Sequence, residues 1–114
     1  MSVSVITAKP KTLLAAIKKA IDDKKVVTWE YDSDGDFTHS PEQWKNKAWF
    51  KPKVMEGRLV LGIVGQAKAN TTSEVYAVYH GRFTEMLLAH FDAEFTIASV
   101  TAMPDSNDSI TSGQ

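Results

Sequence analysis

Residues 44–65 read WKNKAWFKPKVMEGRLVLGIVG, and this stretch decides the fold because it predicts two strands joined by a tight turn. From 47 to 54, lysines and a tryptophan alternate with small or apolar residues, which is the period of a β-strand. A glutamate and a glycine mark the turn, and residues 58–64 form a largely apolar partner strand. We expect this pair at the centre of an antiparallel sheet. Pro52 cannot donate to a ladder, so we expect the first strand to lie at an edge or to end nearby.

Four further segments have the alternating or β-branched pattern of strands. They are residues 2–7, predicted at a sheet edge, and residues 26–31, 75–80 and 94–103. The acidic segment DSDGDFTH at 32–39 has turn chemistry, because aspartate and glycine both tolerate tight turns.

Apolar residues recur at helical spacing in two segments, 11–24 and 82–92. Ser40 and Pro41 have the order of an N-cap and a first helical residue, which predicts a single helical turn leading into Trp44. The predicted order is therefore β, α, β, a helical turn, β, β, β, α, β.

These elements predict an α+β two-layer sandwich. A mainly antiparallel sheet of five or six strands would carry both amphipathic helices on one face. With 114 residues, we expect one compact domain over residues 1–103. Residues 104–114 contain almost no apolar side chains and are predicted to be a disordered tail.

Composition narrows the class of protein. Apolar residues make up 43% and charged residues 24% of the chain, as in soluble globular proteins. No apolar run approaches the roughly 20 residues that span a bilayer, and residues 1–11 lack the pattern of a secretion leader. There is no cysteine, which rules out disulfides and cysteine nucleophiles. We expect a cytoplasmic protein without a membrane partner, metal or cofactor.

The formal net charge is −1, yet the charges are unevenly distributed. Residues 9–25 hold six lysines, and residues 45–58 hold four lysines and an arginine. Residues 30–44 hold five acids and no base, and residues 74–114 hold six acids and one arginine. Segregation of this kind gives the molecule one positive face unless the blocks interleave in three dimensions.

The candidate binding residues cluster in and around the first strand of the predicted hairpin. Lysine ammonium groups attract anionic surfaces, and tryptophan is a frequent anchor of protein interfaces. The predicted binding set is Trp44, Lys47, Trp49, Lys51, Lys53 and Arg58.

Histidines and acids provide the remaining chemical candidates. His80 and Arg82 flank the predicted start of the second helix, and helix N-termini attract anions, so they form a candidate anion site. His39 follows the acidic turn, where it could join a metal or general-base cluster. No nucleophile, base and orienting group can be assembled from spacing, so no catalytic residue is assigned.

Three functional hypotheses follow. The first is a non-catalytic protein-interaction or accessory module that uses the aromatic, lysine-rich sheet face, or an exposed sheet edge, to bind a protein partner or a second copy. The second is binding of single-stranded nucleic acid through the same face, although the sequence pI of about 6.3 is low for that class. The third is a small metal-dependent hydrolase or nuclease that uses His39, His80 and the acidic turn at 32–36.

Overall fold

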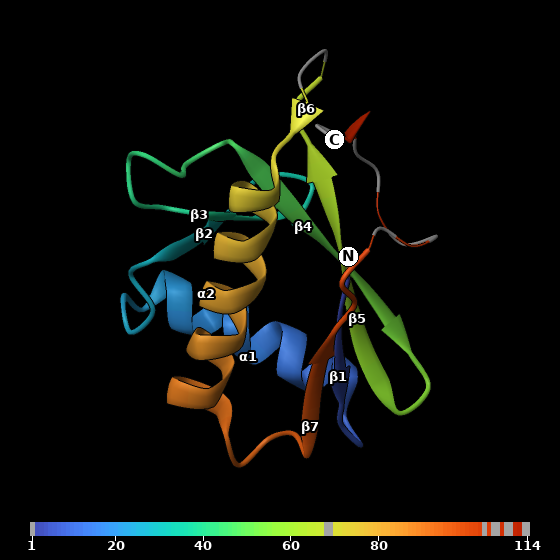
Figure 1. Cartoon of the computed structure of the whole chain (residues 1–114). Coiled ribbons are helices and arrows are strands. Elements are labelled where there is room, and N and C mark those ends of the chain that lie inside the picture. The colour runs from blue at the N-terminus through green and yellow to red at the C-terminus, as the bar shows by residue number, and fades with distance from the viewer. Residues whose placement is uncertain (1, 68–69, 104, 106–107, 109–110, 113–114) are drawn as a thin grey trace.

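The computed structural model describes residues 2–67, 70–103, 105, 108 and 111–112 (Figure 1). The strands are β1 (Ser2–Ile6), β2 (Trp29–Tyr31), β3 (Phe37–His39), β4 (Ala48–Met55), β5 (Arg58–Gly65), β6 (Asn70–Thr71), β7 (Ile97–Val100) and β8 (Thr111–Ser112). The helices are α1 (Pro10–Asp22) and α2 (Ser73–Phe91), which run in clearly different directions in Figure 1. Neither helix is both long and apolar enough to cross a membrane.

Six strands form one sheet in the order β2-β3-β4-β5-β1-β7, and all neighbours are antiparallel. β6 and β8 form a separate parallel pair. Core side chains of both helices pack with those of the sheet in one cluster. The predicted two-layer α+β fold, with a mainly antiparallel sheet, is confirmed.

The predicted hairpin forms the central pair of the sheet. β4 and β5 pair along their whole length, and Gly57 makes the turn with φ +74°. The pairing of β3 with β4 is confined to Phe37 opposite Phe50. Beyond Phe50, β4 therefore pairs with β5 alone among the described residues, which explains why Pro52 is tolerated there.

Two glycines in different backbone conformations give a matched test of this fold. Gly57→Ala should lower the free energy of unfolding by about 1 to 2 kcal/mol, because φ is positive at the turn. Gly81→Ala should raise it by about 1 kcal/mol, because Gly81 lies inside α2 and an added methyl group meets no atom within 4 Å. Urea denaturation of both variants measures the two effects. A lower free energy of unfolding in Gly81→Ala, or a higher one in Gly57→Ala, would contradict the assigned backbone conformations.

A cluster of aromatic rings forms one end of the core. The Trp29 side chain is 1% exposed, and its ring contacts the rings of Phe50, Tyr79 and Phe83 at centroid distances of 5.0–6.0 Å. Two of these contacts are edge-to-face, which is a favourable geometry for aromatic pairs. This cluster joins β2 and β4 to α2.

The predicted strand at 75–80 is wrong, because these residues form the first half of α2. VYAVYH is rich in β-branched and aromatic residues, which favours a strand by propensity alone. The helix is set instead by its start and its buried face. The Thr72 hydroxyl accepts a hydrogen bond from the Val75 N–H at 3.2 Å, as an N-cap does. Tyr76, Tyr79 and Phe83 then lie in one buried stripe.

Three further expectations are corrected. β1 was expected at a sheet edge, but it lies between β5 and β7. The strand expected at 26–31 begins only at Trp29, because the Val26 N–H bonds the carbonyl of Ala20 at the end of α1. Residues 37–39 were expected to belong to a turn, but they form β3.

The remaining elements agree with the sequence apart from their ends. The first helix begins at 10 rather than 11 and ends at 22 rather than 24. The predicted single turn is present, because the N–H groups of Trp44 and Lys45 both bond the Pro41 carbonyl. Ser40 does not cap this turn, because its hydroxyl donates to the Val27 carbonyl. The predicted strand at 94–103 is shorter, at 97–100.

Much of the tail predicted as disordered lies outside the described residues. Of residues 104–114, the structure describes 105, 108 and 111–112. The Asp105 carboxylate accepts from the Ser2 hydroxyl at 2.7 Å, and the Asp108 carboxylate accepts from the Ile63 N–H at 2.8 Å. These contacts bring part of the tail against β1 and β5.

Candidate functional site

The sheet has one face covered by the helices and one uncovered face. Side chains alternate along each strand, and the buried residues Phe50, Leu61 and Val3 point toward the helices. Their neighbours in sequence therefore point the other way. No helix covers this second side, which we call the uncovered face, although Ser2, Val60 and Gly62 on it are buried. It is formed by Ser2, Ser4, Ile6, Trp49, Lys51, Lys53, Met55, Arg58, Val60, Gly62, Val64, Ile97 and Ser99.

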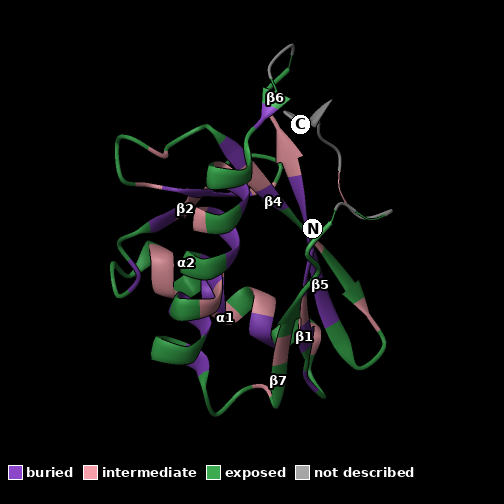
Figure 2. Cartoon of the chain, in the orientation of Figure 1, coloured by how far each residue is buried: buried purple, intermediate pink, exposed green. Residues whose placement is uncertain are grey.

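Basic and apolar side chains are interleaved on the uncovered face. Strand register places Lys53 opposite Val60, and Arg58 opposite Met55. Ile6 pairs with Ile97 on the same face, and their side chains are 40% and 60% exposed. The exposed residues in Figure 2 include parts of β4 and most of β7. The face therefore offers cations beside solvent-exposed apolar groups.

Acidic groups border this face. Burial and the neighbouring carboxylate of Asp32 raise the pKa of Asp36, whereas the positive charge of Lys51 acts in the opposite direction. Lys51 is therefore close enough for its positive charge to stabilise the ionised carboxylate of Asp36. On the other side, Asp105 binds the hydroxyl of Ser2. In strand register, Lys53 and Arg58 lie further along β4 and β5 from both of these acids than Lys51 does.

The structure separates the six residues of the predicted binding set. Trp49, Lys51, Lys53 and Arg58 lie on the uncovered face, where Trp49 is half-buried beside Val64. Lys47 is exposed just before β4. Trp44 instead packs against the core, whereas Trp49 lies on the uncovered face. No spacing signal predicted this separation.

The premise of the predicted anion site at His80 and Arg82 is wrong. α2 begins at Ser73, so both residues lie inside the helix rather than at its N-terminus. The His80 ring is buried, and its Nδ1 lies 2.8 Å from the Tyr76 carbonyl. Arg82 is exposed and pairs with Glu85 at 3.2 Å.

A cleft of about 310 Å³ beside His39 was not predicted from the sequence. Its walls come from the end of the β2–β3 hairpin, from the loop before β4 and from α2. The polar and aromatic residues that line it are Thr28, His39, Gln43, Trp44, Arg82 and Glu85. These positions are spread over 58 residues of sequence, so no local motif reveals them.

The His39 ring is held in a defined orientation. Its Nδ1 lies 2.7 Å from the Thr28 carbonyl, which can only accept, so Nδ1 carries the proton. The ring also stacks at a tilt on Trp29, with centroids 4.7 Å apart. Burial lowers the pKa of His39, so the imidazole is neutral at pH 7 and Nε2 is an acceptor. Among the described residues Nε2 has no hydrogen-bond partner, and it is not sealed from solvent.

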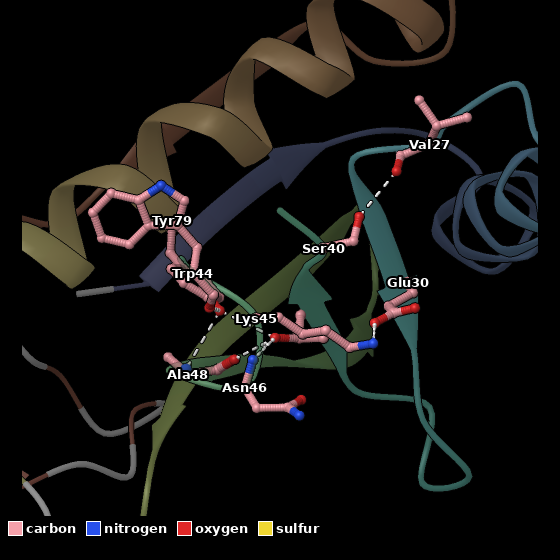
Figure 3. A network of polar contacts seen from close by, with 9 residues as sticks. Val27, Glu30, Ser40, Trp44, Lys45, Asn46, Ala48 and Tyr79 are labelled. Carbon is pink, nitrogen blue, oxygen red and sulfur yellow. Dashed lines mark hydrogen bonds and ion pairs between the residues drawn. The ribbon is translucent and has the colours of Figure 1, made fainter. Parts of the chain in front are cut away.

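Polar contacts fix the loop that forms one wall of the cleft (Figure 3). The Tyr79 hydroxyl of α2 donates to the Trp44 carbonyl. The Lys45 ammonium pairs with Glu30 of β2 at 2.9 Å. Asn46 has φ +61°, and its N–H donates to Thr38 Oγ1 at 3.0 Å. The loop is thus attached to both β2–β3 and α2.

The lowered pKa of His39 predicts a pH-dependent stability. The unfolded chain has the ordinary histidine pKa near 6.5, so below that pH it binds a proton that the folded protein resists. The contribution of the neutral His39 ring to the free energy of unfolding should be complete above pH 6.5 and should be lost as the pH falls toward the pKa of His39 in the folded protein. The total loss is about 1.4 kcal/mol for each unit by which the two pKa values differ. Urea denaturation from pH 7.5 to 5.5 measures this loss, which should shrink in His39→Gln. A His39 pKa at or above 6.5 by NMR would contradict it.

The acidic turn has a structural role in the fold. Asp32 Oδ1 accepts from the N–H groups of Asp34 and Asp36, each at 3.0 Å, and Gly35 has φ +83°. His39 lies at the opposite end of the β2–β3 hairpin, opposite Trp29. The residues of the predicted hydrolase cluster are therefore not brought together. Within the described part of the chain, no three acidic or histidine side chains gather as metal ligands would.

Comparison with known proteins gives no relative, because no family model, curated protein or solved structure matches the chain.

Proposed function

We propose that this protein is a non-catalytic interaction module whose uncovered face binds an acidic protein surface. The observation that carries the proposal is the position of basic side chains beside the exposed Ile6 and Ile97 and the half-buried Met55 on a sheet face that no helix covers. The basic residues are Lys51, Lys53 and Arg58. A partner that matches this pattern has carboxylates next to apolar side chains. Interfaces of this type combine apolar anchors with complementary charges that guide association.

Charge favours a foreign protein over the other occupants of this face. A second copy docked face to face would bring the cations of two identical faces together, which is repulsive. Nucleic acid would place a continuous row of phosphates along the face, including beside Asp36 and Asp105 at its borders, whereas a protein can place its carboxylates next to Lys53 and Arg58 alone. In addition, Trp49 is half-buried, so its ring is a poor stacking platform for bases.

Two labelled probes of equal net charge separate a protein ligand from nucleic acid. One is a ten-residue peptide of glutamate and leucine, and the other is a single-stranded oligothymidine. Fluorescence anisotropy should give tighter binding of the peptide at 150 mM salt, because only the peptide supplies apolar contacts. Tighter binding of the oligothymidine would replace the proposal with the nucleic-acid hypothesis.

A specific observation also favours self-association through the outer edge of β7. The Thr101 N–H donates to the Ser2 carbonyl at 3.1 Å. Residues of a strand alternate in bonding direction, so Ala98 and Val100 point their N–H and C=O groups outward. Residues 97–103 contain no charge or proline to protect this edge. A two-fold axis at Ser99 would pair Ala98 with Val100 of the second copy through four hydrogen bonds.

Proline substitution tests this edge without disturbing the ladder to β1. Ala98→Pro removes only an outward N–H and should weaken the dimer at least tenfold in sedimentation experiments. Ser99→Pro is the matched control, because it removes an inward N–H and should instead destabilise the fold. A wild-type monomer at millimolar concentration, or an unchanged dimer in Ala98→Pro, would exclude pairing through β7.

A further inference from the structure

We propose that the cleft beside His39 binds a small zwitterion of the amino-acid type. The cleft contains a hydrogen-bond acceptor from β3, an aromatic wall from the loop before β4, and a cation and an anion that both come from α2. Its volume of about 310 Å³ lies at the lower end of the range for small-molecule sites. The uncovered face lies on the other side of the sheet, so this site is independent of the proposed function.

The ligand's ammonium group would meet two acceptors. His39 Nε2 is an acceptor because Nδ1 donates to the Thr28 carbonyl. Glu85 adds a carboxylate to the same cleft. An ammonium group has three donors and a positive charge, and it can use both acceptors at once. A ligand with only acceptor atoms would leave His39 Nε2 unpaired.

The ligand's carboxylate would meet Arg82. The contact between Arg82 and Glu85 uses only the Nη1 atom, at 3.2 and 3.3 Å, so Nη2 and Nε of the guanidinium are not engaged by Glu85. Both side chains are exposed, and exposed ion pairs are weak, so a ligand can compete for the arginine. Guanidinium groups bind carboxylates in a two-pronged geometry.

Charge and shape both select for a zwitterion. Arg82 and Glu85 carry opposite charges and His39 is neutral, so the cleft has no net charge. A zwitterion satisfies both ionic groups without leaving a net charge at the site. Trp44 is half-buried beside them and offers an apolar surface for a ligand side chain.

The experiment compares L-leucine with two analogues that each lack one charge. N-acetyl-L-leucine has no ammonium group, and L-leucinamide has no carboxylate. Nitrogen-15 NMR of the histidine rings should show that L-leucine shifts the Nε2 signal of His39. Both analogues should bind at least tenfold more weakly, because each leaves one polar group of the cleft unpaired.

Substitution of the arginine provides the second arm. Arg82→Gln should reduce L-leucine affinity at least tenfold, whereas Arg58→Gln, on the uncovered face, should leave it unchanged. Both arginines are exposed, so both variants are expected to fold. An unmoved His39 signal, equal binding of the three compounds, or equal effects of the two arginine substitutions would overturn the proposal.

Discussion

The double charge reversal Lys51→Glu/Lys53→Glu is expected to weaken binding of the glutamate–leucine peptide on the order of a hundredfold. Both side chains are exposed on neighbouring positions of one face of β4. Reversal replaces two attractions with two repulsions and adds carboxylates next to Asp36, which already lies near Lys51. Binding by the wild type should also weaken as salt is raised, because solvent-exposed charges are screened.

A matched variant separates this local effect from net charge. Lys11→Glu/Lys25→Glu makes the same change of four charge units at exposed positions outside the uncovered face. It should lower affinity by less than threefold, because the altered charges lie outside the binding surface. Equal losses in the two double variants would mean that the peptide responds to overall charge, and the uncovered face would lose its assigned role.

Removing the central ring of the core is expected to have the largest effect on stability. Trp29→Ala should lower the free energy of unfolding by about 3 to 5 kcal/mol, a large share of the total for a small domain. Trp29 is almost fully buried, and its ring contacts those of His39, Phe50, Tyr79 and Phe83. The loss combines the apolar area returned to water with the cavity left behind.

Two controls accompany this measurement by urea denaturation. Val27→Ala, two residues earlier, should cost less than about 0.5 kcal/mol, because Val27 is 71% exposed. Trp29→Phe should lower the free energy of unfolding by less than half as much as Trp29→Ala does. Most of the ring remains in this variant, and no described residue accepts a hydrogen bond from the Trp29 N–H. A loss below 1 kcal/mol in Trp29→Ala would contradict the position of Trp29 at the centre of the core.

The central hairpin was predictable from the sequence because its signal is local. Alternation from 47 to 54 and the apolar run from 58 to 64 each predict a strand, and a glycine between them permits the turn. The same alternation correctly placed Lys51 and Lys53 on one side of β4. Period-two patterning is sufficient wherever one face of a strand is buried and the other is solvated.

The first half of α2 was not predictable from propensity, because residues 75–80 have the composition of a strand. Tyr76 and Tyr79 are three residues apart, a spacing compatible with a helix as well as with a loosely patterned strand. Tertiary contacts decide between them: the Tyr79 ring packs on Trp29, and its hydroxyl binds the Trp44 carbonyl. An N-cap at Thr72 was the one local signal available.

The cleft beside His39 depends on contacts between distant segments. Its acceptor comes from β3 and its ionic groups come from α2, more than 40 residues later in the chain. Trp44 was grouped with Trp49 because they are close in sequence. The loop between them passes through Asn46, which has a positive φ, and it leaves Trp44 packed against the core while Trp49 lies on the uncovered face. Neither the cleft nor the different positions of Trp44 and Trp49 correspond to a sequence motif with a fixed spacing.

The most direct test of the proposed binding surface is an NMR footprint of the glutamate–leucine peptide on the nitrogen-15-labelled protein. The largest amide shifts should occur at Lys51, Lys53, Arg58 and Val60, on the uncovered face, with little change along α2. Shifts concentrated on α2 or around His39, with β4 and β5 unaffected, would show that the peptide does not bind to the uncovered face.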